Sequence, residues 1–155
     1  MPPPARTPIG LVLARTARTA SRAFDEALAA AGGSLPAWLI LLTLKTRQLA
    51  NQRELAEAVG IRGATLTHHL NAMEDGGLVT RHRDAANRRI QHVELTAAGE
   101  ALFRQLAGAA LAFDQRLRAG LDDRDLDVLD GLLARLHANI NDGPAAAGAA
   151  RGTAP

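Results

Sequence analysis

The sequence predicts a mostly helical fold with one small β-hairpin. Hydrophobic residues make up 47% of the 155 residues and aromatic residues only 3%, so leucine, alanine, valine and isoleucine must form the core. Such a composition favours packed helices. Over most of the chain the apolar residues recur every three or four positions, and two short segments in the middle alternate as strands do. The length suits one domain with a real apolar core.

Two helices are expected in the first third of the chain. The segment Ile9–Ala31 has apolar residues on one face and arginines on another, which is the pattern of an amphipathic helix. Gly32 follows it as a helix stop. Ser34 then caps a second helix, which has Pro36 in its first turn and extends to about Thr46. This second helix is apolar nearly all round, so we expect it to be buried.

Two short helices joined by a glycine-containing turn come next. Asn51, with Glu54 three residues later, is a variant of the capping box and begins a helix that ends at Gly60. After residues 61–63 a second helix extends to Asp75. Because the second helix must turn sharply away from the first, this arrangement is typical of a helix-turn-helix.

A hairpin and two long helices complete the prediction. The segments Leu78–Arg83 and Ile90–Leu95 have strand character and flank a polar, basic stretch, which indicates a β-hairpin with a basic tip. Thr96 caps a long helix that is broken at Gly120. The last helix extends to about Ile140 with leucines at three- and four-residue spacing.

The second short helix has one face that suits a DNA groove. On a helical wheel Leu66, Leu70 and Met73 share one stripe, which we expect to face the core. The opposite face carries small and polar side chains: Ala64, Thr65, His68, Asn71 and Ala72. Such a face is slim enough to enter a major groove and can hydrogen-bond to base edges. An ordinary solvated helix face has the same composition, so the helix alone does not decide the function.

The hairpin adds a cluster of arginines beside that helix. Its members are Arg81, Arg83, Arg88 and Arg89, and Asp84 is the nearby acid. Arginines at a narrow turn suit the negative potential of a minor groove, although a basic loop can also serve only for solubility. Together, the helix pair and the basic hairpin predict a winged helix-turn-helix that binds double-stranded DNA.

At this point a family resemblance can be stated. Residues 52–59 and the following stretch IRGATLTHHLNAMEDGGLVTRHRDAANRRIQHVELTAAGE resemble the multiple-antibiotic-resistance regulator (MarR) family of winged-helix repressors, and the helix order outside this stretch agrees. The resemblance implies a homodimer joined by its terminal helices. It also implies binding to pseudo-palindromic operators, often relieved by a small organic effector held between the DNA-binding and dimerisation regions.

The resemblance also assigns roles to residues. Ala64, Thr65, Thr67 and His68 match the base- and phosphate-facing part of the family's recognition helix, and Arg89 matches its wing-tip arginine. Three departures stand out. Asn87 replaces an aspartate that commonly pairs with the wing-tip arginine. Arg62 and Gly63 replace a Ser-Pro start of the recognition helix, and Arg62 can reach a phosphate instead. The absence of cysteine excludes the thiol mechanism of the oxidant-sensing members.

Two further residues are candidates for effector binding. Trp38 lies near the start of a helix expected to be buried, where core packing is the default and lining of a ligand cleft is the alternative. His69 lies about 60° from the Leu66 stripe, so it borders the core. We expect His69 to be a hydrogen-bonded residue at the boundary of the core, and contact with an effector is the alternative.

No enzyme, metal site or cofactor is expected. His68 and His69 point about 100° apart and cannot hold one ion, whereas His82 and His92 can face each other across the hairpin without a recognised metal motif. The acids Asp122, Asp123, Asp125 and Asp127 are explained by helix capping and the helix dipole. Serine-nucleophile and phosphate-loop motifs are absent. The alternative function is a winged-helix interaction or assembly module without specific DNA binding.

The composition also predicts domain boundaries and location. We expect a disordered N-terminus over residues 1–8, one domain over residues 9–142 and a disordered tail over residues 143–155. Within the domain, the winged helix-turn-helix spans about residues 34–96, and the dimerisation helices span about residues 9–31 and 97–141. The most apolar stretch, Leu35–Leu44, is too short to cross a bilayer, and no signal-peptide core precedes it, so a cytoplasmic protein without a membrane partner is expected.

Overall fold

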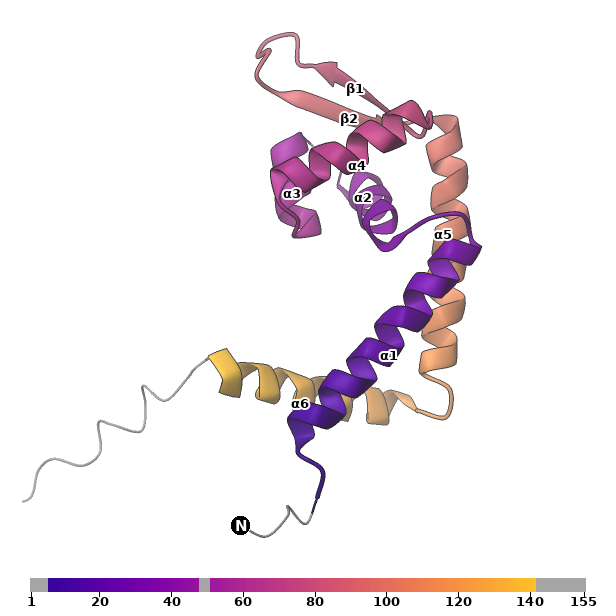
Figure 1. The fold of residues 1–155 in the computed structure, drawn as a ribbon, viewed down its shortest axis with the longest axis vertical. Helices are drawn as coiled ribbons and strands as arrows, with labels where there is room; N and C mark the ends of the chain where they lie inside the picture. The colour runs from indigo at the N-terminus through magenta and orange to yellow at the C-terminus, as the bar shows by residue number, and fades with distance from the viewer. Residues whose placement is uncertain (1–5, 48–50, 142–155) are drawn as a thin grey trace, which may run out of the picture. The chain divides into compact units, whose positions relative to one another are not determined.

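The computed structural model describes residues 6–47 and 51–141, and within them it has the predicted mostly helical fold with one hairpin (Figure 1). The elements are α1 (Ile9–Ala30), α2 (Leu35–Thr46), α3 (Gln52–Val59), α4 (Gly63–Asp75), β1 (Val79–Arg83), β2 (Gln91–Leu95), α5 (Ala97–Leu117) and α6 (Asp123–Asn141). The tail predicted to be disordered lies outside the described residues, and so do residues 1–5 of the N-terminus.

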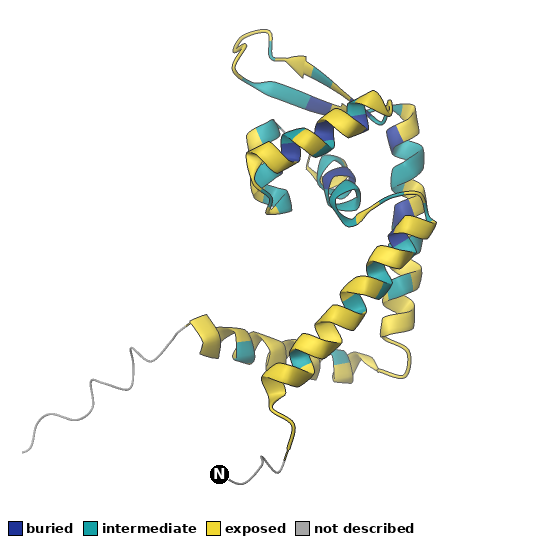
Figure 2. Cartoon of the chain, in the orientation of Figure 1, coloured by how far each residue is buried: buried dark blue, intermediate teal, exposed yellow. Residues whose placement is uncertain are grey.

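The chain divides into two compact units, Met1–Leu117 and Arg118–Pro155. The first unit contains α1 to α5 and the hairpin, and Figure 2 shows where its buried residues lie. The core that they form is almost purely aliphatic. The buried members are Leu28, Ile40, Leu41, Leu55, Leu66, Leu70, Met73, Val79, Val93 and Leu106. The core therefore joins α2 to the helix-turn-helix, to the hairpin and to α5, as a composition poor in aromatic residues requires.

Local capping sets the start and the end of the first helix of the helix-turn-helix, as predicted. Asn51 Oδ1 accepts a hydrogen bond from the backbone N–H of Glu54 at 2.9 Å, which satisfies an orphan donor at the start of α3. Gly60 ends α3 with φ 73°, a left-handed conformation that favours glycine. The chain can therefore turn tightly into α4 three residues later.

The hairpin is an antiparallel pair that is tied to α5. Val79 pairs with Leu95, and His82 pairs with His92 as the sequence suggested. Thr96 Oγ1 accepts the backbone N–H of Gly99 at 3.1 Å and donates to the Gly77 carbonyl at 2.6 Å. This cap starts α5 directly behind the hairpin, so the position of the wing depends on the first turn of α5.

The second unit is helix α6. Its start is closed by a reciprocal pair of bonds: Asp122 Oδ1 accepts from Asp125 N at 2.8 Å, and Asp125 Oδ2 accepts from Asp122 N at 3.2 Å. This confirms capping as the role of these acids. Large apolar side chains along α6 are exposed: Val128, Leu129, Leu132, Leu133 and Ile140.

In the described part of the chain no single helix is long and apolar enough to cross a membrane, and α1 with α2 meets that test only as a pair bent by 75°.

Candidate nucleic-acid interface

Helix α4 presents the two faces that its sequence predicts. Leu66, Leu70 and Met73 are buried in the core. The other face is solvent-exposed and includes Ala64, Thr65, His68, Asn71 and Ala72. The buried stripe fixes the rotation of the helix, so the exposed face is held in one orientation. That face is open to solvent and can enter the major groove of DNA.

Thr67 is used to join the two helices of the motif. Its hydroxyl donates to the Gly63 carbonyl at 2.9 Å and accepts from Gln52 Nε2 at 2.6 Å. Gln52 stands at the start of α3, so this bond fixes α3 against the first turn of α4. The side chain of Thr67 is thus partly buried and positions the helix, which differs from the outward-facing role expected from the resemblance.

Arg81 faces inward rather than into solvent. Its guanidinium is bonded to the Glu74 carboxylate, through Nε at 2.8 Å and also through Nη2, and Nη2 donates to Asn71 Oδ1 at 2.7 Å. Its side chain is only 14% exposed. The reason is strand alternation, because residue 81 shares a face of β1 with the buried Val79. Arg81 therefore ties the hairpin to the end of α4, and its bond also occupies the Asn71 oxygen. The expected contact of Arg81 with DNA stays a prediction.

The contact between Arg81 and Glu74 changes the pKa of the Glu74 carboxyl group. The guanidinium of Arg81, bonded to the Glu74 carboxylate, lowers the pKa of Glu74 below its ordinary value. Glu74 therefore stays ionised in mildly acidic solution, and the bridge between α4 and β1 persists there.

The wing tip presents exposed arginines on a turn held by polar side chains. Arg83, Arg88 and Arg89 are all exposed. Asn87 Oδ1 accepts the backbone N–H of Arg89 at 3.1 Å, so the substitution of asparagine for aspartate leaves a hydrogen bond to the arginine's backbone in place of an ion pair. Asp84, which sequence reasoning noted only as a nearby acid, organises the rest of the turn.

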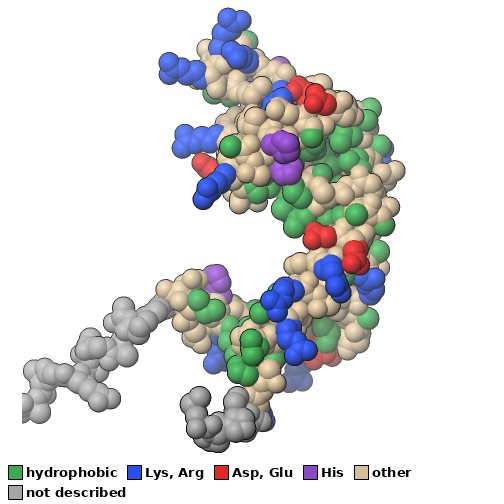
Figure 3. Space-filling view, viewed as in Figure 1, with side chains coloured by type: hydrophobic (Ala, Val, Ile, Leu, Met, Phe, Trp, Pro, Cys, Tyr) green, Lys and Arg blue, Asp and Glu red, His purple; other side chains and the backbone are tan. Residues whose placement is uncertain are grey.

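A cleft of about 1150 Å³ lies between the helix-turn-helix and residues 89–91 of the wing, next to its turn. Its walls include Arg53 of α3, Arg62 at the turn and Arg89 of the wing. Figure 3 shows lysine and arginine side chains gathered at the free end of the hairpin and along the neighbouring edge of the helices. A concave surface lined by guanidinium groups on three different elements suits the phosphate backbone of a nucleic acid.

Gln52 and Arg53 are among the residues of this cleft that the sequence analysis did not assign to a site. Arg53 is highly exposed and lies 3.4 Å from the Glu57 carboxylate one helical turn away. Their position in the sequence could have indicated a DNA contact, because both lie in the first turn of the first helix of the motif. Backbone N–H groups at the start of a helix favour anions such as phosphate.

The two residues expected to meet an effector lie in different surroundings. Trp38 stacks on Phe103 with ring centroids 5.7 Å apart and planes 13° from parallel. His69 lines a cavity of about 340 Å³ together with Ser34, Met73 and Leu102 of α5, and Trp38 is not among the lining residues. The structure thus places His69, rather than Trp38, at a space that can take a small molecule.

Within residues 6–47 and 51–141, no group of three or more His, Asp or Glu side chains is arranged to hold a metal ion.

Comparison with known proteins places these features in context. A model of the MarR family matches residues 34–91. The solved structure of the transcriptional regulator PA3341 is 32% identical to this chain, with a TM-score of 0.70, and the match covers 87% of this chain and 99% of that one. The transcriptional repressor CouR, bound to a 23-mer DNA duplex, is 27% identical with a TM-score of 0.74, covering 84% of this chain and 92% of that one.

A third solved structure, BpsR of Bordetella bronchiseptica, is 20% identical with a TM-score of 0.74, and the match covers 90% of this chain and 99% of that one. DNA binding by BpsR is regulated by 6-hydroxynicotinic acid. At this identity the likeness shows the fold alone.

Proposed function

Because this chain belongs to the MarR family of transcriptional regulators, we propose that it is a sequence-specific repressor that binds a pseudo-palindromic operator as a homodimer. One observation carries the proposal: the start of α4 and the wing arginine Arg89 line the same basic cleft. A recognition helix and a wing that share one basic surface can engage adjacent grooves of one duplex.

The exposed groups divide by the part of DNA that each can reach. Thr65 and His68 lie on the face of α4 that enters a major groove, where hydroxyl and imidazole groups can bond to base edges. Arg53 and Arg62 line the cleft and meet phosphates, while Arg88 and Arg89 reach the minor groove or the phosphates beside it. In this scheme the helix supplies specificity, and the arginines supply most of the salt-dependent affinity.

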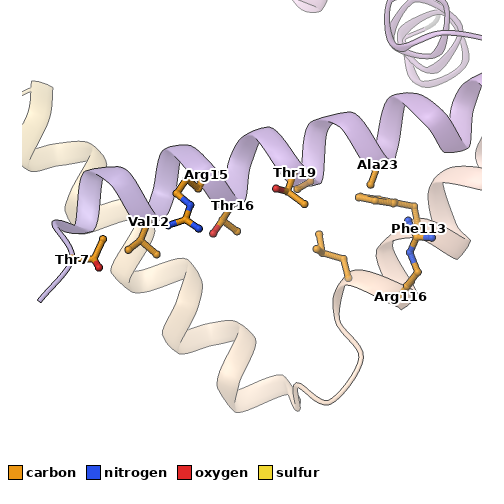
Figure 4. A pocket seen from close by; sticks show the side chains of 10 residues that line it. Thr7, Val12, Arg15, Thr16, Thr19, Ala23, Phe113 and Arg116 are labelled. Atoms are coloured by element: carbon orange, nitrogen blue, oxygen red, sulfur yellow. The ribbon is translucent and has the colours of Figure 1, made fainter.

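The homodimer is supported by the apolar surface of the terminal helices, residues 9–31 and 97–141. In the first unit, large apolar side chains are exposed on α1 and at the end of α5: Ile9, Leu11, Val12, Leu111 and Leu117. Between these helices lies a groove of about 670 Å³, into which Val12, Ala23 and Phe113 point (Figure 4). We propose that a second copy covers this surface together with that of α6, because monomeric proteins rarely expose so much apolar area. The two recognition helices then enter half-sites about 10 base pairs apart.

The test compares Arg89→Ala with the matched variant Arg104→Ala, which removes an exposed arginine from α5. Arg89→Ala should weaken binding to every duplex and lower the slope of affinity against salt by about one to two units, if one phosphate contact is lost per subunit. Arg104→Ala should leave both unchanged. His68→Ala should instead relax preference at one or two base positions, at about 1 to 3 kcal/mol per half-site.

These outcomes separate the repressor from the alternative. If Arg89→Ala changes neither affinity nor salt slope, the wing is not a DNA contact and the proposed surface is wrong. An interaction module without specific DNA binding would show no salt-dependent affinity and would select no palindrome from random duplexes.

We also propose that a small organic effector, a carboxylate or a phenol, releases the DNA from a site near His69 and Trp38. The cavity beside His69 supports this, because it lies between α4 and α5 and so joins the recognition helix to a terminal helix. Calorimetric titration with a panel of aromatic carboxylates and phenols tests the proposal. Binding should be lost in His69→Ala and kept in His137→Ala, which changes an exposed histidine of α6.

A further inference from the structure

The outward face of the hairpin carries a row of four titratable side chains that no DNA contact uses: Glu94, His82, His92 and Asp84. The two imidazoles face each other across the strands with ring centroids 5.4 Å apart. His82 Nε2 lies 3.8 Å from Glu94 Oε1, and His92 Nε2 lies 3.0 Å from Asp84 Oδ2. Each imidazole therefore has its own carboxylate, and the tighter pair is the one next to the wing tip.

Asp84 connects this pair to the turn that bears the arginines. While Oδ2 bonds to His92, Oδ1 accepts the backbone N–H groups of Ala86 at 2.9 Å and Asn87 at 2.8 Å. Asn87 Oδ1 in turn accepts the N–H of Arg89 at 3.1 Å. A continuous chain of hydrogen bonds thus leads from the His92 ring to the backbone of Arg89.

The hydrogen bonds that Asp84 accepts keep its carboxyl group ionised. Hydrogen bonds from His92, and then from the N–H groups of Asn87 and Ala86, lower the pKa of Asp84 below its ordinary value. The carboxylate is consequently present over the whole pH range in which an imidazole changes charge.

We propose that His92 is a positioning residue of the wing: by holding Asp84 it sets the turn that presents Arg88 and Arg89, and protonation of the imidazole tightens that turn. An imidazolium donates from both ring nitrogens, so its Nε2 always donates to Asp84. A neutral imidazole donates there in one tautomer only and directs a lone pair at the carboxylate in the other. The wing is therefore held more firmly in mildly acidic solution. The effect on DNA rests on the proposed function.

Charged groups on the neighbouring elements have other roles. At the end of α2, Lys45 is paired with Glu100 of α5 at 2.9 Å, and Arg47 lines the same surface pocket as Glu94. On α3, Arg53 is paired with Glu57, Glu54 follows in the first turn, and the residue that bridges to the His92 backbone is the neutral Asn51. Arg81 and Arg83 lie on the opposite face of β1.

The first experiment reads the turn directly, in the protein without DNA. In a pH titration from about 8 to about 5, the amide NMR shifts of Ala86, Asn87 and Arg89 should follow one inflection in the wild type, because an imidazole titrates in this range. In His92→Gln the same amides should stay flat, since the glutamine amide keeps a neutral donor toward Asp84 but takes up no proton. His137→Gln should titrate like the wild type. Wing amides that are flat in the wild type, or that move equally in His92→Gln, overturn the proposal.

The second experiment measures affinity for the selected operator at fixed ionic strength. The wild type should bind about threefold to tenfold more tightly at about pH 6 than at about pH 8, because each wing gains a charge and a firmer turn. His92→Gln should lose at least half of this change on a logarithmic scale. His68 lies outside the wing, so His68→Gln should retain the part of the change that His92→Gln loses.

The outcomes distinguish this inference from the function on which it rests. A full pH response in His92→Gln means that His92 does not position the wing. A response that requires added zinc and disappears with a chelator means that the histidine pair is a metal site, which also overturns the proposal. If neither the wild type nor any variant selects an operator, the proposed function fails. The amide titration, which needs no DNA, still decides whether His92 holds the turn.

Discussion

Gly99, in the first turn of α5, lies so close to the hairpin that no side chain fits between them. A Cβ atom at this position would lie 2.0 Å from the Leu78 carbonyl oxygen and 3.3 Å from Leu95 Cδ2. Non-bonded carbon and oxygen atoms rarely approach closer than about 3.3 Å, so the backbone of α5 or of Leu78 would have to move by about 1 Å to make room for the Cβ atom. The Leu78 oxygen cannot move freely, because it accepts the backbone N–H of Thr96 at 3.1 Å. Overpacking and the weakened bond together predict that Gly99→Ala lowers the free energy of unfolding by about 2 to 4 kcal/mol.

Gly108 provides a matched control on the same helix. A Cβ added there meets nothing within 4 Å, and the residue is exposed. Gly108→Ala should therefore raise the free energy of unfolding by about 0.5 to 1 kcal/mol, through helix propensity and a less flexible unfolded chain. Urea unfolding at one protein concentration measures both variants. A Gly99→Ala protein within about 0.5 kcal/mol of the wild type, at an unchanged slope, would refute the close contact between α5 and the hairpin.

Three other predictions concern acid, assembly and oxidation. The lowered pKa of Asp84 means that its stabilising effect is present above the ordinary value of 3.8 and is lost as the pH falls through the folded-state value. Asp84→Asn should thus be less stable than the wild type at neutral pH, and this difference in stability, measured by unfolding at a series of pH values, should shrink only as the pH falls below 3.8. Leu129→Asp with Leu133→Asp, on the exposed apolar stripe of α6, should yield monomers by light scattering where the wild type is dimeric at micromolar concentration; a monomeric wild type contradicts the dimer. Without cysteine, DNA affinity should not fall reversibly on peroxide treatment, and a loss restored by a thiol reductant would contradict this.

The features that the sequence predicted well are those set by neighbouring residues. The caps at Ser34, Asn51 and Thr96 were recognised from residue type and spacing, and each forms the expected bond to a backbone N–H group. The left-handed turn at Gly60 belongs to the same class. Such features need only a few consecutive residues, so local pattern is enough to locate helix ends to within a residue or two.

The features that were missed depend on contacts between elements. Arg53 lines a basic cleft only because residues 89–91 of the wing fold beside α3, a contact that no local pattern records. His92 was considered as a metal ligand facing His82, while its bond to Asp84 across the hairpin turn was not foreseen. The register places Asp84 beyond the last pair of the ladder, where the turn geometry decides which side chains meet.

Arg81 shows why counting charges in a sequence overstates the charge that DNA can meet. Its guanidinium is already bonded to the Glu74 carboxylate and the Asn71 amide, so it is not available to neutralise a phosphate and release the counterions condensed on the DNA. In the described part of the chain, no ion pair involves Arg88 or Arg89, and both are exposed at the tip of the turn. Arg81 lies on the inward face of β1 and is bonded within the protein, whereas Arg88 and Arg89 lie in the turn and are exposed. The salt dependence of binding should therefore follow the arginines of the turn and the cleft, while Arg81 acts by holding the wing against the recognition helix.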